Sequence, residues 1–152
     1  MSGFSEAWLR EYRAKRDVRE DMRAAALWPL VLQLPAPFTL MNVTLREHWA
    51  VRGRRAKAIS ADLAWRLANM APRAPLARAR VVIERHSTGT PDKDGLYGGA
   101  KPLLDALLVR SATHPHGLGL IVDDSPAHLD LDVRAVKCKR AEQCTIVRIE
   151  PA

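Results

Sequence analysis

Alternation of apolar and polar residues at several separated places is the feature that most restricts the fold of this chain. Five stretches have the length and composition of strands: residues 29–35, 78–87, 118–122, 128–139 and 144–150. The last two alternate on either side of the short segment 140–143, which predicts a hairpin. The chain therefore contains enough strand for a small β-sheet.

Segments with helical periodicity lie between these strands. The pattern predicts helices over residues 5–27, 60–71 and 101–110, with Ser60 as the expected N-cap of the second. Pro102 suits the third helix only in its first turn or at a kink, because proline cannot donate a backbone hydrogen bond. Helices and strands intermix without the regular repeat of a doubly wound sheet. We therefore predict an α+β fold, with flanking helices on a small mixed sheet and an extra N-terminal helix.

The first predicted helix carries an apolar stripe that includes Phe4, Trp8 and Tyr12 and is interrupted by Lys15. Its charges are nearly balanced, with six basic and five acidic residues over 5–27. This balance argues against a DNA-binding arm. We expect one face of the helix to pack on the rest of the protein and the other to face solvent.

Composition and charge narrow the class of protein. A length of 152 residues suits one domain, and the net charge of +7 favours an anionic partner such as nucleic acid. Cys138 and Cys144 lie six apart, which fits neither a CxxC redox pair nor a zinc pattern, so we expect free thiols. No stretch has the length of a spanning helix, and no signal-peptide core is present at the start. These features predict a soluble cytoplasmic protein.

Acidic residues gather at two junctions of this basic chain. Asp92 and Asp94 follow the strand over 78–87, and Asp123 and Asp124 end the apolar run at 118–122. On an extended segment, the carboxylates of Asp92 and Asp94 would point the same way, about 7 Å apart. Asp92, Asp94 and Asp124 would supply three oxygen donors without histidine or cysteine, which favours Mg²⁺ or Mn²⁺ over Zn²⁺. The sequence therefore predicts a metal site that binds phosphates.

A structural alternative exists for each of these residues. Aspartates before glycine or proline often cap helices and build turns, as in "PDKDG" and "DDSP". Lys101 stands four residues before Asp105 on a predicted helix, so the two could simply form an ion pair. The repeated combination of an apolar run with paired acids favours metal binding over these alternatives.

The order Asp-x-Asp, Lys-x-x-x-Asp-Ala-Leu and an apolar run ending in Asp-Asp resembles the RusA-type Holliday junction resolvase family, including its phage members. The resemblance covers most of residues 30–150. It implies an endonuclease domain over residues 29–152, preceded by a helical extension at 1–28. It also implies a homodimer that cleaves four-way DNA junctions with Mg²⁺.

Carried over by motif, the family's catalytic residues fall on Asp92, Asp94, Lys101 and Asp124, with the three aspartates as metal ligands. Asp123 is the alternative for the last position. Two features depart from the family pattern. Gly95 stands where members often carry asparagine, and Lys101 comes seven residues after Asp94, three more than in the shorter form of the motif.

A basic segment offers a surface for DNA. Residues 46–57 carry several cations against the single acid Glu47, and Gly53 predicts that the stretch is a flexible loop. Trp49 within it could stack on an unpaired base, but we expect it to be partly buried. The predicted DNA-binding residues are Asn42, Arg46, Arg52, Arg54, Arg55 and Lys57.

These features predict a Mg²⁺-dependent, structure-selective endonuclease, in which metal-activated water attacks a phosphodiester of branched DNA. One alternative is a noncatalytic protein of the same fold that binds branched DNA. Another is a structural or assembly protein whose acidic residues only cap turns.

Overall fold

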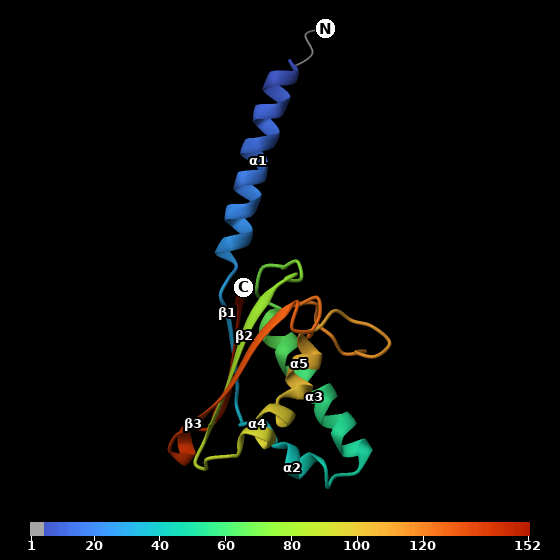
Figure 1. The fold of residues 1–152 in the computed structure, drawn as a ribbon, viewed down its shortest axis with the longest axis vertical. Helices are drawn as coiled ribbons and strands as arrows, with labels where there is room; N and C mark the ends of the chain where they lie inside the picture. Colours follow the sequence, from blue (N-terminus) through green and yellow to red (C-terminus); the bar gives the residue numbers. More distant parts are fainter. Residues whose placement is uncertain (1–4) are drawn as a thin grey trace.

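The computed structural model describes residues 5–152. Its elements are the helices α1 (Glu6–Ala26), α2 (Met41–Thr44), α3 (Trp49–Leu67), α4 (Lys93–Gly99) and α5 (Lys101–Leu107), the 3₁₀ helix η1 (Arg140–Glu142), and the strands β1 (Leu30–Leu34), β2 (Ala79–Ser87), β3 (Leu129–Lys137) and β4 (Cys144–Pro151). Helices and strands are mixed irregularly along the chain, so the predicted α+β class is confirmed (Figure 1).

The four strands form one mixed sheet in the order β1-β4-β2-β3. β4 pairs antiparallel with β1 and with β2, whereas β2 and β3 are parallel. The predicted hairpin between residues 128–139 and 144–150 is therefore wrong, because β2 lies between these strands. The reason is that β2 contains three consecutive buried residues, Val81, Val82 and Ile83, and such a run belongs in the interior of a sheet.

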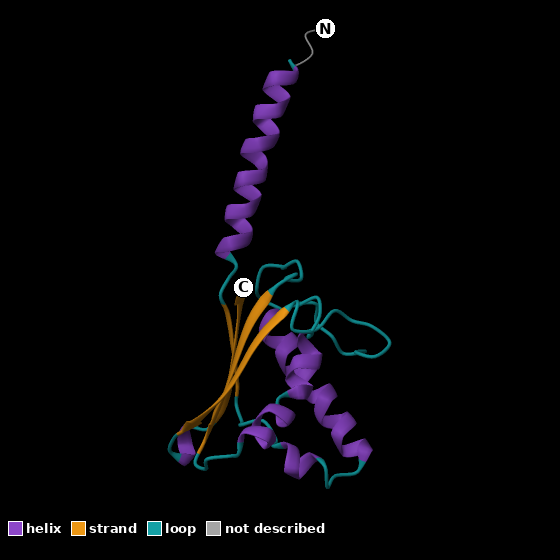
Figure 2. Cartoon of the chain, in the orientation of Figure 1, coloured by secondary structure: helices purple, strands orange, loops and turns teal. Residues whose placement is uncertain are grey.

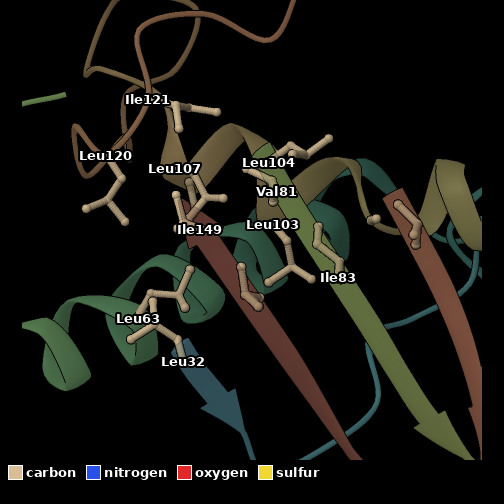
Figure 3. Packing of buried hydrophobic residues seen from close by; sticks show 14 of the residues in the cluster. Leu32, Leu63, Val81, Ile83, Leu103, Leu104, Leu107, Leu120, Ile121 and Ile149 are labelled. Carbon is tan, nitrogen blue, oxygen red and sulfur yellow. The ribbon is translucent and has the colours of Figure 1, made fainter. Parts of the chain in front are cut away.

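Helices cover one face of the sheet (Figure 2). Leu63 of α3 and Leu103 and Leu107 of α5 are fully buried with Val81 and Ile83 of β2 in one hydrophobic cluster (Figure 3). Burying a side chain of this size contributes about 1.5–3 kcal/mol relative to leaving it exposed. The cluster therefore holds α5, which carries Lys101 at its first position, firmly on the sheet.

The start of α3 differs from the prediction. The helix begins at Trp49, with the His48 ring accepting the Ala50 N–H as its cap. Ser60, the predicted N-cap, lies inside the helix, is buried and donates its hydroxyl proton to the His116 carbonyl at 2.6 Å. The flexible loop predicted at 46–57 is thus mostly helix. Arginine, lysine and alanine are strong helix formers, and one glycine does not outweigh them.

α1 extends away from the rest of the chain (Figure 1). Its described side chains are all exposed, so the prediction that one face packs on the domain is wrong; Phe4 lies outside the described residues. The Trp8 and Tyr12 rings stack on each other at 5.2 Å, and Lys15 pairs with Glu11 at 2.7 Å. These contacts within the helix take the place of the expected contacts with the sheet. Within residues 5–152, no helix has the length and apolar character to cross a membrane.

The predicted strand at residues 118–122 does not join the sheet. Ile121 forms isolated parallel bridges with Leu76 and Leu108 and is fully buried. Gly119, at a positive φ of 75°, provides a backbone conformation that other residues rarely adopt. The segment is therefore an ordered connection that leads from α5 to Asp124. Both cysteines are free, as predicted.

Gly99 of α4 is crowded by backbone atoms, whereas Gly53 of α3 has open space around it, so alanine at the two positions should change stability in opposite directions. A Cβ at Gly99 would lie 2.5 Å from the Thr39 carbonyl oxygen and 2.9 Å from the Leu40 Cα, whereas a Cβ at Gly53 would meet nothing within 4 Å. We expect Gly99→Ala to lower the free energy of unfolding by about 1–3 kcal/mol, since backbone atoms must move. Gly53→Ala should instead raise it by about 0.5–1 kcal/mol, because alanine favours a helix. Urea unfolding of both variants measures the difference, and shifts of the same sign would contradict it.

Candidate functional site

Lys101 contacts two acidic residues: Asp105, four residues later on the same helix, and Asp124, which lies beyond that helix in the chain. Its Nζ donates to Asp124 Oδ2 at 2.5 Å and lies 2.9 Å from Asp105 Oδ1. The pairing with Asp105, the structural alternative for this lysine, is therefore present, and the contact with Asp124 is added to it. The three side chains are about one-third to one-half exposed, at 52% for Lys101, 37% for Asp105 and 32% for Asp124. The cluster is accessible to a ligand.

The surroundings of Lys101 fix its charge. Burial alone would lower the pKa of its ammonium group, but the hydrogen bonds and charges of Asp124 and Asp105 outweigh that effect and raise the pKa above its ordinary value. The side chain therefore remains a cation at neutral pH. It can attract and orient a negatively charged group, but it cannot serve as a general base.

Asp105 has a second neighbour. Its Oδ1 lies 3.7 Å from the Nδ1 of His114. This oxygen is buried, and the Lys101 ammonium at 2.9 Å is its nearer cationic neighbour. The carboxylate borders a hollow of about 280 Å³ between α3, α5 and residues 113–116. Sequence reasoning assigned Asp105 only as a partner of Lys101 and did not anticipate this hollow, because the fold of residues 113–116 carries no clear local signal.

Asp92 and Asp94 lie at the start of α4. Asp92 is the N-cap and its side chain accepts the Gly95 N–H at 3.3 Å, while Asp94 stands in the first turn. The expectation that both carboxylates extend from one face of an extended segment is therefore wrong, and the capping alternative applies to Asp92. Gly95 makes this possible, since a Cβ there would lie 2.6 Å from Asp92 Oδ1. Both aspartates remain exposed.

The adjacent acids Asp123 and Asp124 have different partners. A hydrogen bond from the Ser125 hydroxyl lowers the pKa of Asp123, and the charge of His128 contributes to the same shift. Asp123 is thus part of the turn that follows, as expected for an aspartate before Ser-Pro. Asp124 instead points to Lys101. This difference favours Asp124 over Asp123 as the functional member of the pair.

Carboxylates of the predicted site have the oxygen donors that Mg²⁺ prefers. Asp92, Asp94 and Asp124 do not form a closed group, however. Within the part of the chain that the structure describes, no three histidine, cysteine, aspartate or glutamate side chains lie close enough together to hold a metal ion. The predicted convergence of these three aspartates on one ion is therefore not observed among the described residues.

The predicted DNA-binding residues fall into two groups. Arg55 forms a two-pronged ion pair with Glu47 at 2.5 and 2.6 Å, and hydrogen bonding from Arg55 lowers the pKa of Glu47. Its charge is therefore already balanced. The other members are exposed, and their cations form no ion pair within residues 5–152: Asn42 of α2, Arg46 of the following turn, and Arg52, Arg54 and Lys57 of α3.

Trp49 departs from the prediction that it is partly buried. Its side chain is 71% exposed, at the first position of α3, with the His48 ring tilted against it at 5.2 Å. Ala50 and Val51 of the same turn are half-buried, so the first turn of α3 packs through these residues and leaves the indole in solvent.

Comparison with known proteins adds no relative. No protein-family model matches the chain. No curated protein matches it significantly either. The function of this chain must therefore be inferred from its own residues and their geometry.

Proposed function

We propose that this chain is a Mg²⁺-dependent, structure-selective endonuclease of the RusA type, which cleaves four-way junctions or related branched DNA. The observation that carries the proposal is the 2.5 Å contact between Lys101 Nζ and Asp124 Oδ2. It joins two residues of the resolvase-like motif that are 23 positions apart in the chain. Helix capping and turn formation do not require this contact.

In this proposal, Asp92, Asp94 and Asp124 would hold the metal. The chemistry that bound Mg²⁺ supplies is a lower pKa for the attacking water and neutralisation of the leaving oxygen. Lys101 keeps Asp124 oriented and presents a permanent positive charge to the phosphoryl group, where negative charge grows during the reaction. Asp105 holds Lys101 from the other side and is a positioning residue.

Binding would depend on phosphate charge and on junction shape. Arg46, Arg52, Arg54 and Lys57, which form no ion pair with any residue of the described range 5–152, suit phosphate groups and read no base sequence. Affinity should therefore fall steeply as salt concentration rises. A homodimer would place two such sites about a two-fold axis, which matches the pseudo-symmetry of a four-way junction. Reducing conditions in the cytoplasm would suit the two free thiols.

One observation favours a second candidate, a noncatalytic protein that binds branched DNA. Asp92 is engaged as a helix cap and Asp124 as the partner of Lys101, and no three acidic or metal-binding side chains gather among residues 5–152. A chain of this kind could retain the basic surface without cleaving DNA. The two candidates make different predictions for a single assay.

The deciding assay is incubation of the purified chain with an end-labelled synthetic four-way junction and a linear duplex of the same sequence. The endonuclease proposal predicts symmetrical nicks near the branch that need Mg²⁺ and disappear when EDTA removes it, with little cleavage of the duplex. Tight binding of the junction without nicks, at any Mg²⁺ or Mn²⁺ concentration, would establish the binding protein instead. If the chain neither binds nor cleaves the junction, both candidate functions are wrong.

A further inference from the structure

The turn between α2 and α3 exposes two large apolar side chains. Leu45 is 66% exposed and Trp49 is 71% exposed. Trp49 is the first residue of a 19-residue helix, so its backbone is fixed even though its indole faces solvent. An exposed aromatic ring of this size is poorly explained by folding alone, since burial would be favourable. It is well suited to contact a ligand.

Charged residues around this ring define what it can contact. Arg46 precedes it by three residues, Arg52 and Lys57 follow it within the next three turns, and none of these forms an ion pair within the described chain. The nearby acid, Glu47, is neutralised by Arg55. The surface around Trp49 is therefore apolar at its centre and positive at its edge. That combination is typical of sites where bases stack on aromatic rings while cations contact the phosphates.

The position of Trp49 on the helix connects it to the candidate site. Gly53 and Ala56 follow it by four and seven residues, so the three lie on one face of α3. Gly53 and Ala56 line the hollow that Asp105 and His114 border from the other side. The hollow and its glycine leave open space along this face. A strand that passes from Trp49 along the face would reach the neighbourhood of Lys101.

We propose that Trp49 stacks on an unpaired base of a DNA strand whose backbone follows the basic residues of α3, with Leu45 as a neighbouring apolar wedge. The inference rests on the proposed function for the source of the unpaired base, which is the branch point of the substrate. It adds a means of selecting structure: base pairs inside a continuous duplex stay closed, whereas pairs next to a branch open more readily and expose a base to the ring.

Trp65 provides a matched control. It is 75% exposed on the same helix. Sixteen residues separate it from Trp49, which at 3.6 residues per turn places the two rings on nearly opposite sides of α3. Its neighbours include the ion pair between Arg66 and Asp62, at 3.3 Å, so its surroundings are not positive. If removal of any exposed indole weakened DNA binding, substitution of Trp65 and of Trp49 would weaken it equally.

The test measures DNA binding and tryptophan fluorescence in EDTA, so that it does not depend on cleavage. The probe is a four-way junction with two unpaired thymines at its branch, and a linear duplex is the reference. We expect the junction to quench the tryptophan fluorescence of the wild type and of Trp65→Phe. Quenching should be much smaller for Trp49→Phe, because that variant lacks the indole that stacks on the base. Trp49→Ala should bind the junction roughly 5- to 150-fold more weakly, and Trp65→Ala should bind like the wild type.

Equal junction affinity and equal quenching for the Trp49 and Trp65 variants would overturn the inference. Conversion of a dimer to a monomer by Trp49→Ala, measured by sedimentation, would also overturn it, because the ring would then belong to a contact between two copies. Neither result depends on nuclease activity. If the wild type cleaves junctions but the Trp49 variants behave like it, the proposed nuclease function stands and the stacking contact is wrong. If Trp49 stacks on the junction but the wild type does not cleave it, the stacking contact stands and the nuclease function is wrong.

Discussion

Lys101→Met should reduce the single-turnover rate of junction cleavage by about 10²–10³-fold, the loss typical of removing one group that stabilises charge in the transition state. Methionine has a similar length but carries no charge, so Asp124 and Asp105 lose the cation that lies 2.5 and 2.9 Å from them. Junction binding should change much less, because the basic residues of α3 remain. The measurement is cleavage of a labelled junction with enzyme in excess.

The pH profile separates this role from that of a base. Since the pKa of Lys101 lies above its ordinary value of 10.5, the ammonium group stays protonated throughout the assay range. The contribution of lysine protonation to stability is complete below the ordinary pKa of lysine and is lost as pH rises through the raised pKa. Wild-type cleavage should therefore show no loss from lysine deprotonation below about pH 9.

Lys101→Arg is the control, because it keeps the charge and should retain part of the rate. The stability of Lys101→Met should fall by no more than about 1 kcal/mol, as expected for half-exposed ion pairs. An unchanged cleavage rate in Lys101→Met would remove this residue from the site. A loss of rate that follows a large loss of folded protein would indicate a structural role instead.

Two substitutions of Asp92 should both abolish most of the cleavage but differ in their effect on stability. Asp92→Asn keeps an efficient N-cap for α4 but loses the charge, so we expect little change in stability and a large loss of cleavage. Mutation of a residue that only supports a metal ligand typically lowers metal affinity or activity about 10–100-fold, and mutation of a direct ligand should lower it at least as much. Asp92→Ala should lose cleavage to the same extent and also lower the free energy of unfolding by about 0.5–2 kcal/mol.

The comparison distinguishes the capping role from the metal role. If Asp92 only caps α4, Asp92→Asn will behave as wild type in every assay and only Asp92→Ala will be affected. Asp123→Asn serves as the control for loss of a nearby negative charge, because Asp123 bonds to Ser125 rather than to the Lys101 cluster. It should cleave junctions at close to the wild-type rate.

Local sequence patterns predicted where the strands lie along the chain better than they predicted which strands pair with each other. The strands at β1, β2, β3 and β4 all appear where alternation predicted them, but their order does not follow from alternation. A period of two identifies which residues share a face, whereas pairing depends on how much of each strand must be buried. β2, with its run Val81, Val82 and Ile83, took an interior position between β3 and β4.

Helix boundaries were least predictable where cations predominate. Residues 46–57 lack an apolar stripe of their own, so periodicity gave no helix there, although alanine, arginine and lysine favour one. α1 shows the opposite case. Its helical pattern was correct, but the weak stripe interrupted by Lys15 was not enough to hold it on the sheet, and its length is supported by contacts within the helix such as Lys15 with Glu11.

The identities of the candidate site residues came from sequence, and their contacts came from the fold. The spacing of Lys101 and Asp105 predicted their ion pair, because residues four apart on a helix are neighbours. The contact of Lys101 with Asp124 depends on the buried connection around Ile121, which no local pattern specifies. Gly95 left Asp92 free to fold onto the helix end, so the capping alternative given by the sequence applies to Asp92 and the extended geometry does not.

The most direct test of the central claim is where a divalent ion binds. Mn²⁺ titrated into isotopically labelled protein broadens the amide signals of nearby residues. We expect broadening centred on Asp92, Asp94 and Asp124, with loss of that broadening in Asp92→Asn. Signals of the exposed acids of α1, such as Glu11 and Glu20, should be much less affected. Broadening spread evenly over exposed acids, or unchanged by Asp92→Asn, would contradict a metal-dependent catalytic site here.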